Sequence, residues 1–127
     1  MSLSLAEIRA AERRIAGGVI VTPCPVSIPL SEITGARLVC KLENFQRTGS
    51  FKERGARNAL LRLPLIRRRR GVIAASAGNH ALGLAYHGKM LGIPVTVVMP
   101  ATAIALEVRR LLSGTPVCAV KLNALGV

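Results

Sequence analysis

The chain opens with apolar residues at helical spacing and with charged residues between them. This pattern is typical of an amphipathic helix, because residues three and four positions apart share one helix face. Two consecutive glycines, Gly17 and Gly18, are expected to end this helix. The apolar positions are Leu5, Ile8, Ala11 and Ile15.

Prolines and glycines interrupt the next part of the chain, so only short elements are expected there. Residues 22–25 should be extended, because a residue that precedes proline avoids helical backbone. A short helix is expected over residues 30–33, ended by Gly35, and a short strand over residues 37–42. The loop of residues 44–49 then leads into a longer helix.

Ser50 is followed three residues later by Glu53, which is the pattern of a capping box at a helix start. The helix predicted here runs to about Leu63, since Pro64 stops it. The four arginines at 67–70 are expected to form a connector. The side chains expected to face inward are those of Ala56, Ala59, Leu60 and Leu63.

A strand, a helix and a second strand follow, with short connections between them. Residues 71–75 and 94–99 are typical of strands, and residues 79–91 carry apolar side chains at helical spacing. This order predicts a right-handed βαβ unit and a parallel sheet, and therefore an α/β fold. Helical potential returns over residues 103–112, and another strand is expected over residues 117–122. The helix positions expected to face inward are Ala81, Leu84, Ala85, Gly88 and Leu91.

The composition changes this picture in one respect, because the formal net charge is +12 with half of the residues apolar. A strong basic excess is typical of nucleic-acid-binding proteins. The basic residues are scattered, however, apart from the arginines at 67–70, and few aromatic side chains are present to stack on bases. We therefore favour a solvated basic surface, or a face covered by an acidic segment, over specific nucleic-acid binding.

Three cysteines, Cys24, Cys40 and Cys118, lack the spacing of a metal site. They are expected to be buried or partly buried free thiols in a reducing compartment. No apolar run approaches the roughly 20 residues of a membrane span, and no signal-peptide pattern is visible at the start. The expectation is a cytoplasmic protein with no membrane partner and no metal site.

Two stretches carry candidate chemistry. Lys52 falls in the first turn of its predicted helix, where the helix dipole disfavours a cation. This favours the neutral amine that bonds to an aldehyde, although an ordinary surface lysine is the alternative. Residues 74–81, with the sequence AASAGNHA, form a strand-to-helix turn whose backbone N–H groups suit an anion.

Together these stretches resemble the pyridoxal-phosphate (PLP) enzymes of fold type II, and most closely the threonine dehydratase (threonine ammonia-lyase) and serine racemase group. The resemblance covers roughly residues 5–100, and its motifs appear in the family's order and spacing. It implies a truncated form of the family's three-layer parallel-sheet α/β domain. The matching residues are 22–23, 41–44, 46, 48–52, 54–56, 58, 71–81, 91–94 and 99–100.

The resemblance also implies roles for individual residues. Lys52 matches the lysine that bonds covalently to PLP and moves the α-proton of the substrate. Phe51 would lie beside the cofactor ring, and Asn79 matches the amide that bonds the ring hydroxyl oxygen. The residues matching the loop that holds the substrate carboxylate are Ser76, Ala77, Gly78, Asn79 and His80.

Structural roles are open for several of these residues. Phe51 also fits an ordinary core aromatic, Asn79 a helix N-cap, and His80 a structural histidine. We interpret His87 as a surface or structural residue. Glu53 and Arg54 are interpreted as structural, Glu53 through the capping box and Arg54 through pairing at the surface or with the cofactor domain.

The chain departs from the family pattern in several places. It contains no glycine-rich run that would cradle the cofactor phosphate, and residues 101–127 do not continue the family pattern. We therefore expect residues 1–127 to form a partial PLP-enzyme domain, similar to the family over residues 5–100 and divergent over residues 101–127. A truncated or frameshifted reading of a longer protein is one hypothesis that fits.

The function implied is β-elimination of threonine or serine to a 2-oxo acid and ammonia, in amino-acid metabolism such as isoleucine biosynthesis. Because the phosphate loop is not found in the sequence, we expect this chain alone to bind PLP poorly and to be weak or inactive. A serine racemase-like isomerase is one alternative. Another is a non-catalytic fragment that associates with a full-length homologue. The expected partner is a small amino-acid substrate, and the full-length parent is expected to be a homo-oligomer.

Overall fold

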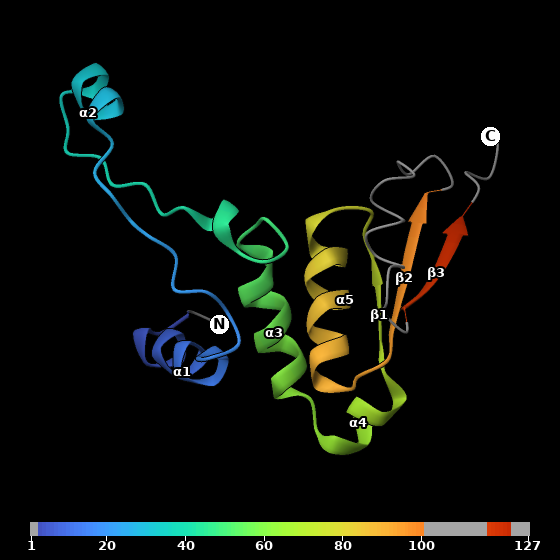
Figure 1. Ribbon diagram of the computed structural model, residues 1–127. Helices are drawn as coiled ribbons and strands as arrows, with labels where there is room; N and C mark the ends of the chain where they lie inside the picture. The colour runs from blue at the N-terminus through green and yellow to red at the C-terminus, as the bar shows by residue number, and fades with distance from the viewer. Residues whose placement is uncertain (1–2, 101–116, 123–127) are drawn as a thin grey trace.

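The computed structural model describes residues 3–100 and 117–122 (Figure 1). Helices and strands alternate along the second half of this part, and helices with extended segments make up the first half. The elements are α1 (Leu5–Ile15), α2 (Ile28–Thr34), the 3-10 turn η1 (Glu43–Phe45), α3 (Lys52–Arg62), α4 (Leu65–Arg70), β1 (Val72–Ala75), α5 (Asn79–Leu91), β2 (Val95–Pro100) and β3 (Val117–Leu122).

The strands form a parallel sheet in the order β1-β2-β3. Val72 pairs with Val95, and Val95 pairs in turn with Val117. This confirms the predicted parallel α/β fold, including the strand expected at 117–122. In Figure 1, α5 lies against the sheet and α3 lies on the other side of α5. Both helices begin at the end of the molecule where β1 and β2 finish.

The core lies between the sheet, α5 and α3. Leu60 is only 1% exposed, and burying a side chain of this size stabilises the fold by roughly 2 kcal/mol. Two glycines let the layers approach closely. A Cβ atom at Gly83 would lie 3.3 Å from Ala56 Cβ, and one at Gly88 would lie 2.4 Å from Val95 Cγ2. The buried core residues of this cluster are Ala56, Leu60, Ala81, Leu84, Ala85, Ile93, Val95, Val97 and Met99.

The capping box predicted at Ser50 and Glu53 is wrong. α3 begins at Lys52, its N-cap residue is Phe51, and no side chain caps it. Glu53 instead is fully buried. Its carboxylate accepts a hydrogen bond from the backbone N–H of Thr48 at 3.2 Å, and this bond partly compensates for the burial. The capping box in this structure belongs to α1, where Ser4 and Glu7 bond each other's backbone.

The connector predicted at residues 67–70 is part of helix α4. Its Arg68 guanidinium donates to the carbonyl oxygens of Leu63 at 2.9 Å and Leu61 at 2.7 Å. These carbonyls lie at the end of α3, where helical partners run out. The arginine-rich run therefore folds back to satisfy the preceding helix.

Other expectations at the surface also need correction. The strand expected over residues 37–42 is only an isolated bridge between Val26 and Val39. Ala59 is exposed, and Cys24 is exposed where a buried or partly buried thiol was expected; Cys40 is half-buried. The helix expected over 103–112 and the side chain of Cys118 lie outside the described residues.

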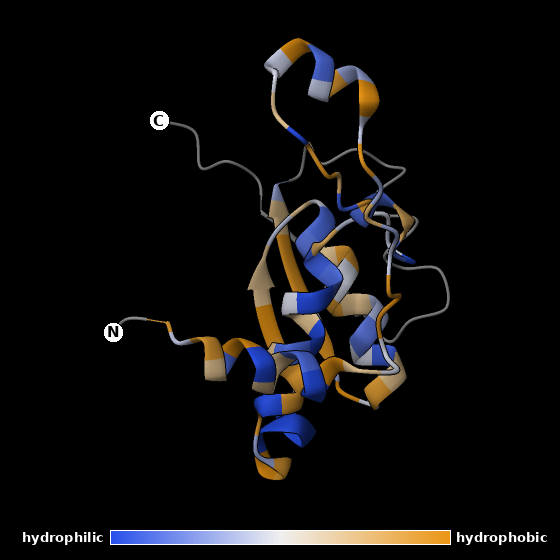
Figure 2. Ribbon diagram, turned by 90° about the vertical axis from the view of Figure 1, so that its left-hand side faces the viewer, coloured by the Kyte–Doolittle hydropathy of each residue, from blue (hydrophilic) through white to orange (hydrophobic). Residues whose placement is uncertain are grey.

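The short helix expected over residues 30–33 is confirmed as α2, and this helix stands apart. α2 ends at Gly35 as expected, and it lies away from the remaining helices and the sheet (Figures 1 and 2). Its Ile28 and Ile33 side chains are 67% and 81% exposed. Among the residues described, no helix is both long enough and apolar enough to cross a membrane.

Candidate functional site

The turn of residues 76–80 connects the end of β1 to the start of α5 (Figure 1). The backbone N–H of Ser76 bonds Val98 O at 3.0 Å, which fixes the turn to the neighbouring strand. Gly78 is the N-cap of α5, so the first N–H groups of this 13-residue helix have no helical acceptor. These groups, with the helix dipole behind them, can bind an anion.

Asn79 is the first residue of α5, and its side chain is exposed. It makes no side-chain cap, so the N-cap alternative for Asn79 is wrong. His80 is half-buried in the same turn. The structure thus brings all five residues matching the carboxylate loop together at one helix N-terminus and leaves the Asn79 amide accessible.

Lys52 is the first residue of α3, and the N-terminal ends of α3 and α5 lie at the same end of the molecule (Figure 1). Its amine is 5.1 Å from the centre of the Phe51 ring. Phe51 is 60% exposed, so it is not a core aromatic in the described structure. The two helices are fixed to each other here, since a Cβ atom at Gly83 of α5 would lie 3.3 Å from the Lys52 carbonyl oxygen. Lys52 and the 76–80 turn therefore occupy one end of a tightly packed helix pair.

A network of polar side chains holds the loop that leads to Lys52. Glu43 accepts two bonds from the Arg54 guanidinium, both 2.7 Å, and one from the Thr22 hydroxyl at 2.6 Å. Gln46 bonds both the N–H and the carbonyl of Ile20, as a neighbouring strand would. The loop is thereby tied to the extended segment around residues 20–22.

The Glu43 carboxylate is strongly stabilised by this network. Its hydrogen bonds from Arg54 lower the pKa of Glu43 from 4.5 to about 2, against an opposing effect of burial. A bidentate arginine–carboxylate pair fixes orientation as well as charge. Arg54 therefore pairs within this chain, across the loop, and the expectation that it pairs at the surface or with another domain is corrected.

A second pair is buried between α3 and α5. Glu53 and His87 are both 0% exposed, and His87 Nε2 lies 3.8 Å from Glu53 Oε1. Burial lowers the pKa of His87 to about 4, and the positive charges of Arg57 and Arg47 add to this effect. His87 is thus a structural residue, and the surface alternative is wrong.

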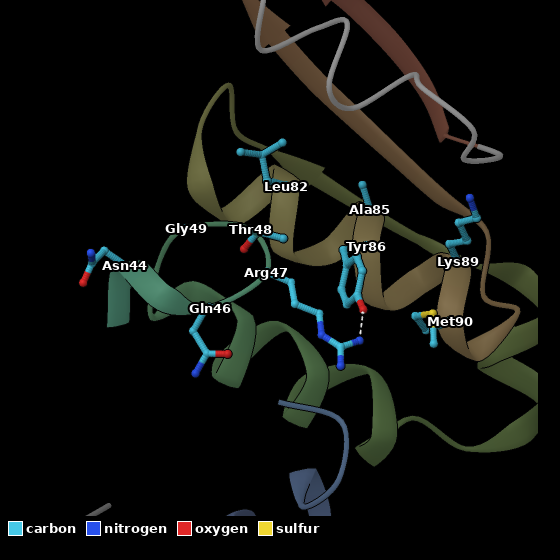
Figure 3. A pocket seen from close by; sticks show the side chains of 10 residues that line it. All are labelled: Asn44, Gln46, Arg47, Thr48, Gly49, Leu82, Ala85, Tyr86, Lys89 and Met90. Carbon is cyan, nitrogen blue, oxygen red and sulfur yellow. Dashed lines mark hydrogen bonds between the residues drawn. The ribbon is translucent and has the colours of Figure 1, made fainter. Parts of the chain in front are cut away.

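A pocket lies elsewhere, between the 44–49 loop and α5 (Figure 3). It has a volume of about 740 Å³. Arg47 from the loop reaches toward α5 and donates a hydrogen bond to the Tyr86 hydroxyl. None of the predicted site residues lines it. The lining residues are Asn44, Gln46, Arg47, Thr48, Gly49, Leu82, Ala85, Tyr86, Lys89 and Met90.

Comparisons with known proteins agree with this geometry. The sequence profile of the family described as pyridoxal-phosphate dependent enzyme matches residues 15–114. L-threonine ammonia-lyase from Thermotoga maritima is 48% identical over 101 residues, which are 80% of this chain and 25% of that protein. L-threo-3-hydroxyaspartate ammonia-lyase from a Pseudomonas species is 50% identical over 101 residues, which are 80% of this chain and 31% of that protein.

A solved structure extends the likeness to the fold. Serine racemase from Dictyostelium discoideum superposes with a TM-score of 0.86 and 34% identity over 94% of this chain and 40% of its own. The fold expected from the resemblance is therefore confirmed. The chain spans between a quarter and a third of the length of the curated relatives it matches. By sequence and by fold, this chain belongs to the family of pyridoxal-phosphate dependent enzymes.

Proposed function

We propose that the protein carrying this chain is a PLP-dependent ammonia-lyase acting on an amino acid with a β-hydroxyl group, threonine or serine. The observation that carries the proposal is that Lys52 and the 76–80 turn lie at the N-terminal ends of two packed helices, α3 and α5, which begin at the same end of the molecule. An amine that can bond to an aldehyde and a turn that can bind a carboxylate, at one end of a parallel sheet, match the needs of PLP-dependent chemistry on an amino acid. The relatives named as ammonia-lyases support the reaction class.

The described residues fit the aldehyde end of PLP. Lys52 is exposed, so its amine can reach an aldehyde carbon. Phe51 offers an exposed ring next to it, and Asn79 offers an exposed amide. The phosphate end is different, because the chain has no glycine-rich run to hold it. We therefore propose that this chain attaches PLP covalently and binds the substrate carboxylate. We expect the isolated chain to hold PLP weakly.

Each residue would contribute one part of the chemistry. PLP, when bound, withdraws electrons from the bond that breaks at the substrate α-carbon. Lys52 would hold PLP through its amine, and the same amine, when free, would take the α-proton of the substrate as a general base. The N–H groups in the first turn of α5 would bind the substrate carboxylate, and this would fix which α-carbon bond is presented. The Asn79 amide orients the cofactor ring without adding charge.

The products distinguish this proposal from its alternative. An ammonia-lyase releases a 2-oxo acid and ammonia from L-threonine or L-serine, whereas a racemase returns the D-amino acid. The likeness to serine racemase, with a TM-score of 0.86, supports the racemase as the second candidate. Measuring both products from each substrate decides between them. Turnover that persists unchanged in Lys52→Ala would contradict both.

The wider setting is also proposed. A role in amino-acid metabolism in the cytoplasm, for example in isoleucine biosynthesis, is consistent with the names of the relatives. The exposed apolar side chains of α2 support association with a second copy or a homologue. Analytical ultracentrifugation of wild type and of an Ile33→Glu variant tests this, and a monomer at all concentrations would contradict it.

A further inference from the structure

Two ionisable side chains meet in the buried interface between α3 and α5. Glu53 and His87 are both 0% exposed, and their nearest oxygen and nitrogen atoms are 3.8 Å apart. That distance is too long for a direct hydrogen bond. Glu53 Oε1 and both nitrogens of His87 have no other hydrogen-bond partner among the residues described. Buried polar atoms are normally paired, so this arrangement calls for an explanation.

The other oxygen of Glu53 connects the pair to the candidate site. Glu53 Oε2 accepts the backbone N–H of Thr48 at 3.2 Å, which holds the segment that runs from Thr48 to Lys52. Glu53 is also the residue after Lys52 in α3. On the far side, His87 belongs to α5, the helix whose first turn carries residues 76–80. One carboxylate therefore stands between the loop before Lys52, the helix of Lys52 and the helix of the carboxylate-binding turn.

The surrounding charges favour a neutral imidazole as the donor. Arg57 from α3 and Arg47 from the 44–49 loop are the cations acting on His87, and they disfavour a further positive charge. Tyr86 contributes an edge-on ring contact, with ring centres 5.0 Å apart. A neutral His87 can still donate its Nε2–H to Glu53. A shift of about 1 Å closes the present gap to a charge-assisted hydrogen bond.

We propose that Glu53 and His87 are positioning residues for Lys52, joined by an Nε2–H to Oε1 hydrogen bond that fixes the amine relative to the 76–80 turn. The Lys52 carbonyl already packs against Gly83, one helical turn from His87, so movement of α5 against α3 moves Lys52 as well. The inference rests on the proposed function in one respect, that Lys52 bonds to PLP. It goes further in assigning the geometry of that lysine to a buried pair that never touches the cofactor.

The test compares two replacements of His87 in the protein that carries this chain. His87→Phe keeps a ring against Tyr86 and removes the donor, whereas His87→Gln keeps an N–H donor. Each variant is mixed with PLP, quenched with borohydride at timed intervals, and digested to quantify the modified Lys52 peptide by mass spectrometry. Rates are expressed per folded molecule, with the folded fraction taken from circular dichroism.

A misplacement of about 1 Å slows a positioned reaction by on the order of 100-fold, so we expect His87→Phe to label about 10- to 100-fold more slowly. His87→Gln should recover most of the wild-type rate. The Thr48 amide should exchange its hydrogen faster in His87→Phe, while the amide of Leu84, in the middle of α5, should not change. Glu12→Gln, at an exposed carboxylate of α1, is the matched control and should label like wild type.

Three outcomes separate the possibilities. Wild type that never labels at Lys52 sinks the proposed function itself. Wild type and His87→Phe that label at equal rates per folded molecule overturn the positioning role, even if His87→Phe is less stable. Should His87→Phe fail to fold, Glu53→Leu replaces it, because leucine is apolar and removes the hydrogen-bond acceptor. Labelling of Glu53→Leu at the wild-type rate per folded molecule then overturns the inference.

Discussion

Gly88 and Gly55 offer the same chemical change with opposite expected signs. Both are helical glycines, and replacing one by alanine favours a helix by about 1 kcal/mol. At Gly55 of α3 an added Cβ atom meets nothing within 4 Å. At Gly88 of α5 it would lie 2.4 Å from Val95 Cγ2 and 2.9 Å from the Ile93 carbonyl oxygen.

The neighbours of Gly88 cannot easily move away. Val95 is 2% exposed and pairs with β1 on one side and β3 on the other. The Ile93 backbone is held by a 2.8 Å hydrogen bond from its N–H to Gly88 O. Overpacking costs typically about 1–3 kcal/mol, and a contact with fixed backbone belongs at the upper end. Subtracting the helix gain leaves a net loss of about 2 kcal/mol for Gly88→Ala.

Urea denaturation followed by circular dichroism at 25 °C measures both variants against wild type. The free energy of unfolding should fall by about 2 kcal/mol in Gly88→Ala and rise by about 1 kcal/mol in Gly55→Ala. The corresponding changes in Tm are about 8 °C down and about 4 °C up. A Gly88→Ala variant as stable as wild type would refute the close packing of α5 on β2, because nothing else in the comparison differs.

Three further predictions concern polar groups. Glu43→Gln should lower the free energy of unfolding by roughly 3 kcal/mol at pH 7, because the folded pKa of Glu43 is about 2. The stabilisation by the Glu43 carboxylate should be lost as the pH falls from 4.5 towards 2. Glu32→Gln on α2 is the exposed control, and a difference between Glu43→Gln and wild type that stays constant down to pH 2 would contradict the low pKa. The free energy of unfolding of wild type should fall by up to roughly 3 kcal/mol between pH 6.5 and pH 4, because His87 takes up a proton in the unfolded chain at a higher pH than in the folded protein. The same pH titration of His87→Gln should not show this fall. Arg68→Ala should lower the free energy of unfolding by about 1–2 kcal/mol, because it leaves the Leu61 and Leu63 carbonyl oxygens without their hydrogen bonds. Arg69→Ala, at an exposed arginine of the same helix, should stay within about 0.5 kcal/mol of wild type in the same chemical denaturation. Equal effects of the two variants would argue against the role of Arg68 in capping α3.

The part of the fold that the sequence predicted best is the βαβ unit. Its strands are short apolar runs, whereas its helix carries apolar residues at helical spacing. Gly92 ends the helix, and Pro94 precedes the second strand. Such local signals survive because tertiary contacts reinforce them here. The placement of Lys52 and the 76–80 turn at one end of the helix pair follows from the same topology, since both lie where a strand or loop enters a helix.

Long-range polar contacts were beyond the reach of local patterns. Glu53 satisfies the capping-box spacing, yet its carboxylate accepts a bond from Thr48 and lies opposite His87, 34 positions later in the chain. The arginines at 67–70 look like a solvated run, but Arg68 bonds the end of α3. A weak signal existed for Glu43 and Arg54, which are opposite charges flanking one loop. Spacing alone does not show that the loop folds them together.

The measurement closest to the central claim is the site at which PLP attaches. The protein carrying this chain is incubated with PLP, reduced with borohydride and mapped by peptide mass spectrometry, with Lys52→Ala and Lys41→Ala treated in parallel. Lys41 is a suitable comparison, since its amine bonds the Thr22 carbonyl at 2.6 Å, away from the candidate site. We predict one modified lysine, Lys52, retained in Lys41→Ala and lost in Lys52→Ala. Modification spread over several surface lysines, or unchanged in Lys52→Ala, would contradict the account.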